Sequence, residues 1–156
     1  TGYDTLTYTL SDDAAASDEA TVTFRLDGRN DAPQAADDAF SVNNDSSLTG
    51  NVIGAAGGGA DGDVDEGAVL HVSAVNGAPG AVGVAVALPS GAQLTLNADG
   101  SFVYDPDGAF AGDGVDSFSY TLSDEYGATS TATVTMTIAD VNDAPDGSTP
   151  WLPTWW

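Results

Sequence analysis

Acidic residues are the groups in this chain best suited to chemistry, and their spacing suits a hard divalent cation. The segment Asp61-Gly-Asp63-Val-Asp65-Glu66 places carboxylates at positions i, i+2 and i+4. In a turning loop this spacing can aim several oxygens at one point, as Ca²⁺ binding requires. The loop is not an EF-hand, because its glycine, Gly67, comes one position late and Val72 stands where a bidentate Glu would be. A solvated acidic loop is the alternative interpretation.

A second acidic motif, Asp140-Val-Asn142-Asp143, combines two carboxylates, a side-chain amide and backbone carbonyls. We expect it to bind a cation at the point where the chain leaves the fold. Asp and Asn also favour turns for their own local hydrogen bonds, so a turn role stays open for every acid considered. The other acids expected near one or other end of the fold are Asp37, Asp38, Asp105, Asp107, Asp113, Asp116, Asp124 and Glu125.

The overall charge also favours cations. The 156 residues contain 24 acids against Arg25 and Arg29, with no Lys, for a formal charge of −22. Such a chain cannot neutralise phosphates, which excludes a nucleic-acid-binding surface, and an anionic membrane surface is disfavoured for the same reason. Self-repulsion opposes compaction unless cations offset it. Because Cys is absent, disulfides cannot stiffen the fold, and Ca²⁺ on oxygen ligands is the expected substitute.

Enzymatic chemistry is not expected. His71 is the single His, and the alternation of the strand pattern places its side chain on the outward face. The ligands of a zinc site are lacking, and no Ser lies in a nucleophile elbow. Two carboxylates could form a glycosidase pair. In a chain with 24 acids, however, finding such a pair does not indicate that activity.

The elements that must position these acids are short strands. Period-2 alternation of apolar residues with Thr and Ser, with turn signals every 8–12 residues, is typical of an all-β sandwich. The strands are expected at residues 3–11, 20–26, 37–42, 48–53, 69–75, 82–88, 93–96, 101–105, 115–123 and 131–139. The predicted buried face includes Phe102, Tyr104, Phe118, Tyr120, Leu122, Val134, Met136 and Ile138.

An internal repeat fixes the organisation of the chain. The segment Gly2–Pro33 aligns without gaps on Gly114–Pro145 at an offset of 112, with 16 of 32 positions identical. We therefore predict the closing hairpin of a preceding repeat plus a linker over 1–33, a complete repeat over 34–145, and a C-terminal extension over 146–156. A lone hairpin is marginal in water, so residues 1–33 need partner strands, from upstream sequence or from another surface.

The phrases NADGSFVYDP, DSFSYTLSD and DVNDAP together resemble the cadherin-like, VCBS-type or bacterial Ig-like tandem repeats of large bacterial surface adhesins exported by type I secretion. The resemblance covers about residues 31–145 and implies an extracellular Ig/cadherin-like antiparallel sandwich in a tandem array, with Ca²⁺ at the junctions. The junction motif maps onto Asp140, Asn142 and Asp143. In the first copy Gly28, Asn30 and Asp31 correspond, with the first acid missing or shifted to Asp27.

The C-terminal extension is a separate feature. It ends in Trp151-Leu152-Pro-Thr-Trp155-Trp156, which holds every Trp of the chain. Clustered exposed aromatics usually mark an interface. Three interpretations compete. The extension could dock into a groove of another subunit, it could be an end that is foreign to the natural protein or wrongly read, or it could insert at a membrane interface.

Three functions follow as expectations. The first is a Ca²⁺-stiffened spacer or adhesive repeat of a bacterial adhesin at the cell surface, with neighbouring repeats or a surface or matrix molecule as partners. The second is a subunit of a self-assembling extracellular filament, joined by strand or tail exchange between identical subunits. The third is a module that binds a glycan or another cell-surface ligand.

Overall fold

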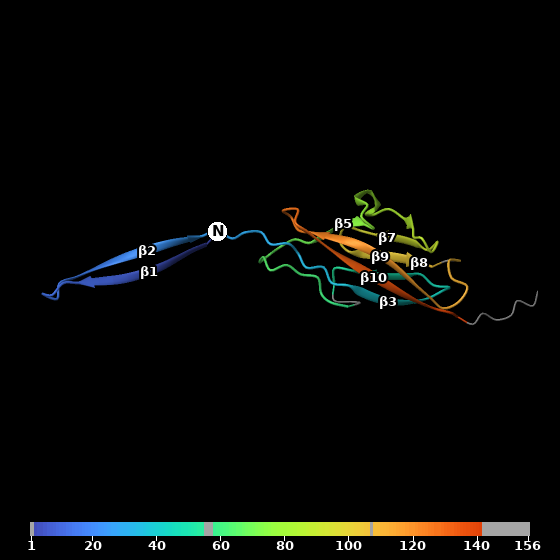
Figure 1. Ribbon diagram of the computed structural model, residues 1–156, viewed down its shortest axis with the longest axis horizontal. Helices are drawn as coiled ribbons and strands as arrows, with labels where there is room; N and C mark the ends of the chain where they lie inside the picture. Colours follow the sequence, from blue (N-terminus) through green and yellow to red (C-terminus); the bar gives the residue numbers. More distant parts are fainter. Residues whose placement is uncertain (1, 55–57, 107, 142–156) are drawn as a thin grey trace, which may run out of the picture. The chain divides into compact units, whose positions relative to one another are not determined.

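The structure is a computed structural model that describes residues 2–54, 58–106 and 108–141 (Figure 1). The chain divides into two compact units, Thr1–Asp31 and Ala32–Trp156. We refer to them as the hairpin unit and the sandwich unit. The four residues of the tail that were singled out above, Trp151, Leu152, Trp155 and Trp156, lie outside the described residues, as do Asn142 and Asp143.

The hairpin unit consists of β1 (Gly2–Ser11) and β2 (Ser17–Leu26), which pair antiparallel. Asp12 builds the turn, because its carboxylate accepts hydrogen bonds from the backbone N–H groups of Ala14 and Ala16 at 3.0 and 2.9 Å. Every described residue of this unit is exposed. Its alternating apolar residues therefore form one side of a two-stranded ribbon without covering a core.

The sandwich unit consists of two four-stranded sheets. The first sheet has the order β3-β10-β9-β5 and the second the order β4-β8-β7-β6. The strands are β3 (Asp38–Asn43), β4 (Leu48–Asn51), β5 (His71–Val75), β6 (Val86–Ala87), β7 (Gln93–Leu96), β8 (Ser101–Asp105), β9 (Gly114–Ser123) and β10 (Thr129–Ala139). This confirms the all-β, Ig/cadherin-like sandwich expected from the strand pattern.

Pairing is antiparallel throughout except between β3 and β10, which run parallel with Asp38 opposite Val134. The start of β3 therefore lies at the same end of the sandwich as the turn between β9 and β10. Ala35 donates to the Ser130 hydroxyl at 3.2 Å at this end. We call it the linker end, and we call the opposite end, where β3 and β10 finish, the tail end.

The core lies between the two sheets. Alternate residues of β8, β9 and β10 point into it, as the period of two requires. All eight residues predicted to be buried are found there, each at most 2% exposed. Phe102 in β8 packs edge-on against Phe40 in β3, with ring centroids 5.0 Å apart, and against Phe118 in β9 at 6.3 Å.

One predicted strand is mostly absent. The pattern suggested 82–88, but only Val86–Ala87 pairs, with β7. A 3₁₀ turn at Pro79–Ala81 precedes it, and Gly83 has a φ of +73°, which extended backbone does not tolerate. The strand expected at 69–75 similarly begins only at His71, whose side chain is exposed as predicted.

Candidate functional site

The buried hydroxyl of Tyr120 lies at the centre of an oxygen cluster near the linker end. Tyr120 comes from the middle of β9 and is fully buried. Its hydroxyl oxygen is 2.9 and 3.1 Å from the two carboxylate oxygens of Asp61 and 3.5 Å from Asp38 Oδ2. The carbonyl oxygens of Ala36 and Val52 lie at 3.2 and 3.4 Å. A hydroxyl carries one hydrogen, and its shortest contact is with Asp61.

Three segments distant in sequence supply this cluster. Asp38 begins β3, Asp61 lies in the loop after β4, and Tyr120 lies in β9. Asp61 also accepts a hydrogen bond from the backbone N–H of Ala36 at 2.8 Å, which attaches its loop to the linker. Burial raises the pKa of the Tyr120 hydroxyl strongly, as does its hydrogen bond to Asp61. The hydroxyl therefore remains a donor, and the carboxylates remain the negative groups of the cluster.

Asp38 is the unusual member. Its side chain is 3% exposed, and its Oδ1 has no hydrogen-bond partner. Burial raises the pKa of this carboxyl to about 6, and the negative charge of Asp61 adds to the effect, whereas the hydrogen bond from Tyr120 opposes it. A buried carboxylate normally has full hydrogen bonding or a counter-charge. Asp38 lacks both a partner for Oδ1 and a nearby protein cation.

Protein cations are missing from the whole sandwich unit. Arg25 and Arg29 both precede residue 32, so 17 of the 24 acids stand in a segment without Lys or Arg. Arg25 already pairs with Asp27, at 2.8 Å and with both side chains exposed. The sandwich unit therefore supplies no Lys or Arg to offset the charge of the Asp38–Asp61 pair.

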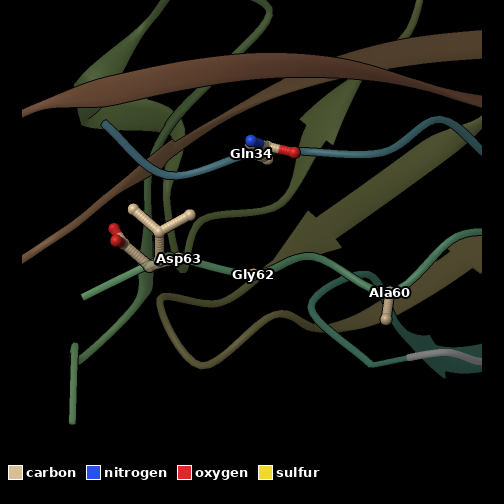
Figure 2. Close-up of a pocket in the computed structure, with 5 residues that line it drawn as sticks. Gln34, Ala60, Gly62 and Asp63 are labelled. Atoms are coloured by element: carbon tan, nitrogen blue, oxygen red, sulfur yellow. The ribbon is translucent and has the colours of Figure 1, made fainter. Parts of the chain in front are cut away.

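A shallow hollow adjoins the same loop. Its volume is about 170 Å³, and Gln34, Ala60, Gly62, Asp63 and Val64 line it (Figure 2). Gln34 and Gly62 exchange two backbone hydrogen bonds, at 2.7 and 3.0 Å, so the linker and the loop run side by side here. Asp63 Oδ2 is buried without a hydrogen-bond partner. Its Oδ1 accepts from the backbone N–H of Asp65 at 2.8 Å, so the 61–65 segment forms a turn.

Sequence reasoning placed Asp61, Asp63 and Asp65 in one cation loop, but the described structure distributes them. Asp61 faces the core through Tyr120, and Asp63 faces the hollow. Across the described residues, no three His, Cys, Asp or Glu side chains form a group able to hold a metal ion by themselves. Any ion here must take the rest of its ligands from carbonyls and water.

The remaining predicted acids at the linker end have structural partners. Asp37 is exposed and accepts from the backbone N–H of Thr133 at 2.8 Å. Asp124 is 2% exposed and builds the turn between β9 and β10, because it accepts from Tyr126 N–H and Ala128 N–H at 2.9 and 2.8 Å. Both side chains fix the backbone around the cluster.

Asp116 lies away from that cluster, near the start of β9. It accepts hydrogen bonds from the Ser90 hydroxyl at 2.6 Å and the Tyr104 hydroxyl at 3.0 Å. Ser90 lies in the loop between β6 and β7, and Tyr104 lies in β8, so both donors belong to the second sheet, whereas Asp116 lies in β9 of the first. Asp116 therefore joins the two sheets through hydrogen bonds.

At the tail end, Asp140 is the described residue of the predicted exit motif. Its carboxylate accepts from the Asn44 side-chain amide at 2.9 Å, and its backbone N–H donates to Asp113 at 2.7 Å. Asn44 also accepts from the Val141 N–H at 3.1 Å. In the hairpin unit, the Asn30 side chain donates to the Asp31 carbonyl at 3.0 Å.

Residues 30–140 match the family described as the bacterial cadherin-like domain. The chain belongs to this family. No curated protein matches its sequence. The cadherin-like fold is a non-catalytic structural fold, and such domains serve as structural or adhesive repeats that are typically extracellular. Within the described residues, no helix is long and apolar enough to span a membrane.

The titration of Asp38 gives a measurable prediction for the cadherin-like sandwich without divalent cations. The pKa of Asp38 is about 6 in the folded chain, against 3.8 for an unperturbed Asp. Between those pH values the folded state therefore holds a proton that the unfolded state has released. The free energy of unfolding contributed by this group therefore rises as the pH falls from 7.5 to 4.5. Replacing Asp38 by Asn removes the charge, so we expect Asp38→Asn to be more stable than the parent by about 2 kcal/mol at neutral pH.

Urea unfolding in excess chelator at several pH values checks this prediction. The advantage of Asp38→Asn should shrink steadily towards pH 4.5, where the parent carboxyl is itself protonated. Asp45→Asn is the matched control, because Asp45 is exposed and the substitution removes one negative charge, as Asp38→Asn does. A difference between Asp38→Asn and the parent that stays constant from pH 4.5 to 7.5 would contradict the assignment.

Proposed function

We propose that this chain is a Ca²⁺-stiffened spacer or adhesive repeat of a bacterial surface adhesin, working outside the cell. The observation that carries the proposal is the Asp38–Asp61 pair around Tyr120, in which Asp38 is buried and Asp61 half-buried, in a sandwich unit without Lys or Arg. Two carboxylates in one buried site repel each other unless a positive charge lies between them. Neighbouring repeats of the same kind are the proposed partners.

The residues at the linker end fit a calcium ion. Asp38 offers an oxygen without a hydrogen-bond partner, Asp61 offers a second carboxylate, and the carbonyls of Ala36 and Val52 lie around the same hydroxyl. Ca²⁺ accepts such a mixture of carboxylates, backbone carbonyls and water, whereas Mg²⁺ demands a tighter octahedral site. The ion would supply positive charge to the pair. With only two carboxylates we expect weak binding, with a Kd of about 10⁻⁴–10⁻³ M, as in other extracellular modules.

Such a site would act on rigidity. Asp61 already attaches its loop to the linker through Ala36, and Asp38 is the first residue of β3, opposite Val134 of β10. A cation shared by both carboxylates would hold the linker, the loop and the first sheet together. Stiffness at this end is what a spacer needs, because force passes from one repeat to the next through the linker.

Thermal unfolding with and without calcium tests the proposal. At 1 mM calcium, which is about one to ten times Kd, mass action should add about 0.4–1.4 kcal/mol to the free energy of unfolding. For a sandwich of this size the melting temperature should then rise by about 2–10 °C. Excess chelator should reverse the shift.

Two controls sharpen the result. Mg²⁺ at the same concentration should give a smaller shift, because general screening alone would act equally for both ions. Asp45→Asn should keep the calcium response, since its exposed carboxylate lies outside the cluster. Identical melting in calcium and in chelator would refute calcium stiffening and leave the family assignment unaffected.

A further inference from the structure

The hairpin unit copies the closing hairpin of the sandwich in backbone geometry as well as in sequence. In β1–β2, Gly2 pairs with Leu26 and Tyr8 with Ala20, and in β9–β10, Gly114 pairs with Ile138 and Tyr120 with Ala132. Each partner differs from its counterpart by the same 112 residues. The two hairpins therefore have one register, and the same side chains fall on the same face.

The turns agree as well. Asp12 accepts from the N–H groups two and four residues ahead, and Asp124 does the same. Ala15 has a φ of +66°, and its counterpart Gly127 has +87°. A left-handed conformation is costly for a residue with a side chain. Ala15 nevertheless adopts the same turn conformation as Gly127.

The two hairpins differ in what covers their apolar face. Phe118, Met136 and Ile138 are at most 2% exposed, whereas their counterparts Leu6, Phe24 and Leu26 are 56%, 50% and 58% exposed. The other four hydrophobic inward positions carry identical residues in the two hairpins. They are Tyr8 and Tyr120, Leu10 and Leu122, Ala20 and Ala132, and Val22 and Val134. The face that is buried in β9–β10 is thus exposed in the described hairpin unit.

Its edges are equally unpartnered. In the sandwich, β9 pairs with β5 and β10 pairs with β3 along their outer edges. In the described part of the hairpin unit, β1 and β2 pair only with each other. A suitable partner must therefore supply an apolar sheet and two flanking strands at once. A membrane surface or a single docked peptide offers neither arrangement.

We propose that the hairpin unit docks into an open cadherin-like sandwich, meaning a unit with strands equivalent to β3–β8 but without a closing hairpin of its own. A second intact copy of this chain is not the favoured occupant, because its own β9–β10 already fills that position. Polar complementarity supports this occupant. Asp4 matches Asp116, which accepts from Tyr104 of the opposing sheet, and Tyr8 matches Tyr120, which donates to Asp61. The proposal does not depend on calcium.

The first test asks whether the face of the hairpin unit fits such a sheet. The triple variant Phe118→Leu, Met136→Phe, Ile138→Leu gives the full chain the inward residues of β1–β2 at β9–β10. Because total volume is nearly conserved and such swaps are tolerated, we expect one cooperative melting transition within about 10 °C of the parent. Phe118→Leu alone and Met136→Phe alone should each melt below the pair together, because the lost and gained volumes compensate. A triple variant without a cooperative transition would overturn the proposal.

The second test measures docking. The acceptor is a polypeptide of residues 32–113, which lacks the closing hairpin, and a peptide of residues 114–141 is the positive control for its competence. Mixed with the full chain in excess chelator, the acceptor should slow amide exchange in residues 2–26 at least about tenfold. Leu6→Asp should abolish this protection. Thr5→Asp should keep it, because its counterpart Ser117 is exposed.

Three outcomes count against the proposal. The acceptor could bind the control peptide and leave residues 2–26 unprotected, or protection could survive Leu6→Asp. The full chain alone could become protected as its concentration rises, which would identify exchange between copies instead. An acceptor unable to bind even the control peptide leaves the triple variant to decide.

Discussion

Replacing Phe102 by Ala should lower the free energy of unfolding of the sandwich unit by about 3–5 kcal/mol, the usual cost of removing a fully packed Phe. The ring is 2% exposed and lies between the two sheets, in edge contact with Phe40 and Phe118. A Cβ added at Gly50 would lie 2.6 Å from this ring, so the neighbouring strand has left room for it. Collapse around a truncated side chain is therefore limited, and urea unfolding followed by circular dichroism should show the full loss.

Val103→Ala is the matched control for this variant. Val103 is the next residue of the same strand, and its side chain is 43% exposed on the outer face. The substitution removes two methyl groups from a half-exposed position, so we expect a loss of about 0.5 kcal/mol or less. Comparable losses in the two variants would show that the aromatic contacts between the sheets carry little of the stability.

Core and candidate site contribute differently to this fold. The core is mainly apolar, with Asp116 as a buried hydrogen-bond acceptor between the sheets. The oxygen cluster lies beside it and joins the linker and the loop of Asp61 to β9. A cation should therefore change the stiffness of the linker end more than the existence of the sandwich.

Strand positions and the buried face were predictable from the sequence, because a period of two fixes which side chains share a face. Phe102, Tyr104 and Tyr120 show this directly. The parallel pairing of β3 with β10 was not predictable, since local pattern contains no information on which distant strands pair. The short β6 was also missed, because Gly83 and the turn at Pro79–Ala81 override the strand propensity of the Val residues that follow.

The candidate site was predictable only in part. Asp38 and Asp61 were singled out as acids, but nothing local indicated that a core tyrosine would bring them together. The signal that could have found the pair is the repeat. Tyr8 and Tyr120 are identical between the copies, on a strand face that is otherwise apolar apart from Asp4 and Asp116, and a buried Tyr needs a partner for its hydroxyl. Asp124 was equally prominent in the sequence, and the structure gives it a turn role.

Replacing Asp61 by Ala should produce a loss that depends on calcium. In chelator the variant leaves the Tyr120 hydroxyl and the Ala36 N–H without their closest acceptor, which costs about 1–3 kcal/mol, partly offset because Asp38 loses a negative neighbour. In millimolar calcium the variant additionally loses the ion, and the total should reach about 1.5–4 kcal/mol relative to the parent. Urea unfolding of both proteins in both buffers measures the two losses.

Asp61→Asn separates charge from hydrogen bonding in the same experiment. Its amide oxygen can still accept from Ala36 N–H and Tyr120, while the negative charge beside Asp38 is gone. We therefore expect Asp61→Asn to be at least as stable as the parent in chelator and less stable than the parent in calcium. A sign change between the two buffers is the signature of a cation at this pair, because a purely structural role for Asp61 predicts the same loss with and without calcium. Equal losses in the two buffers for both variants would remove Asp61 from the calcium site.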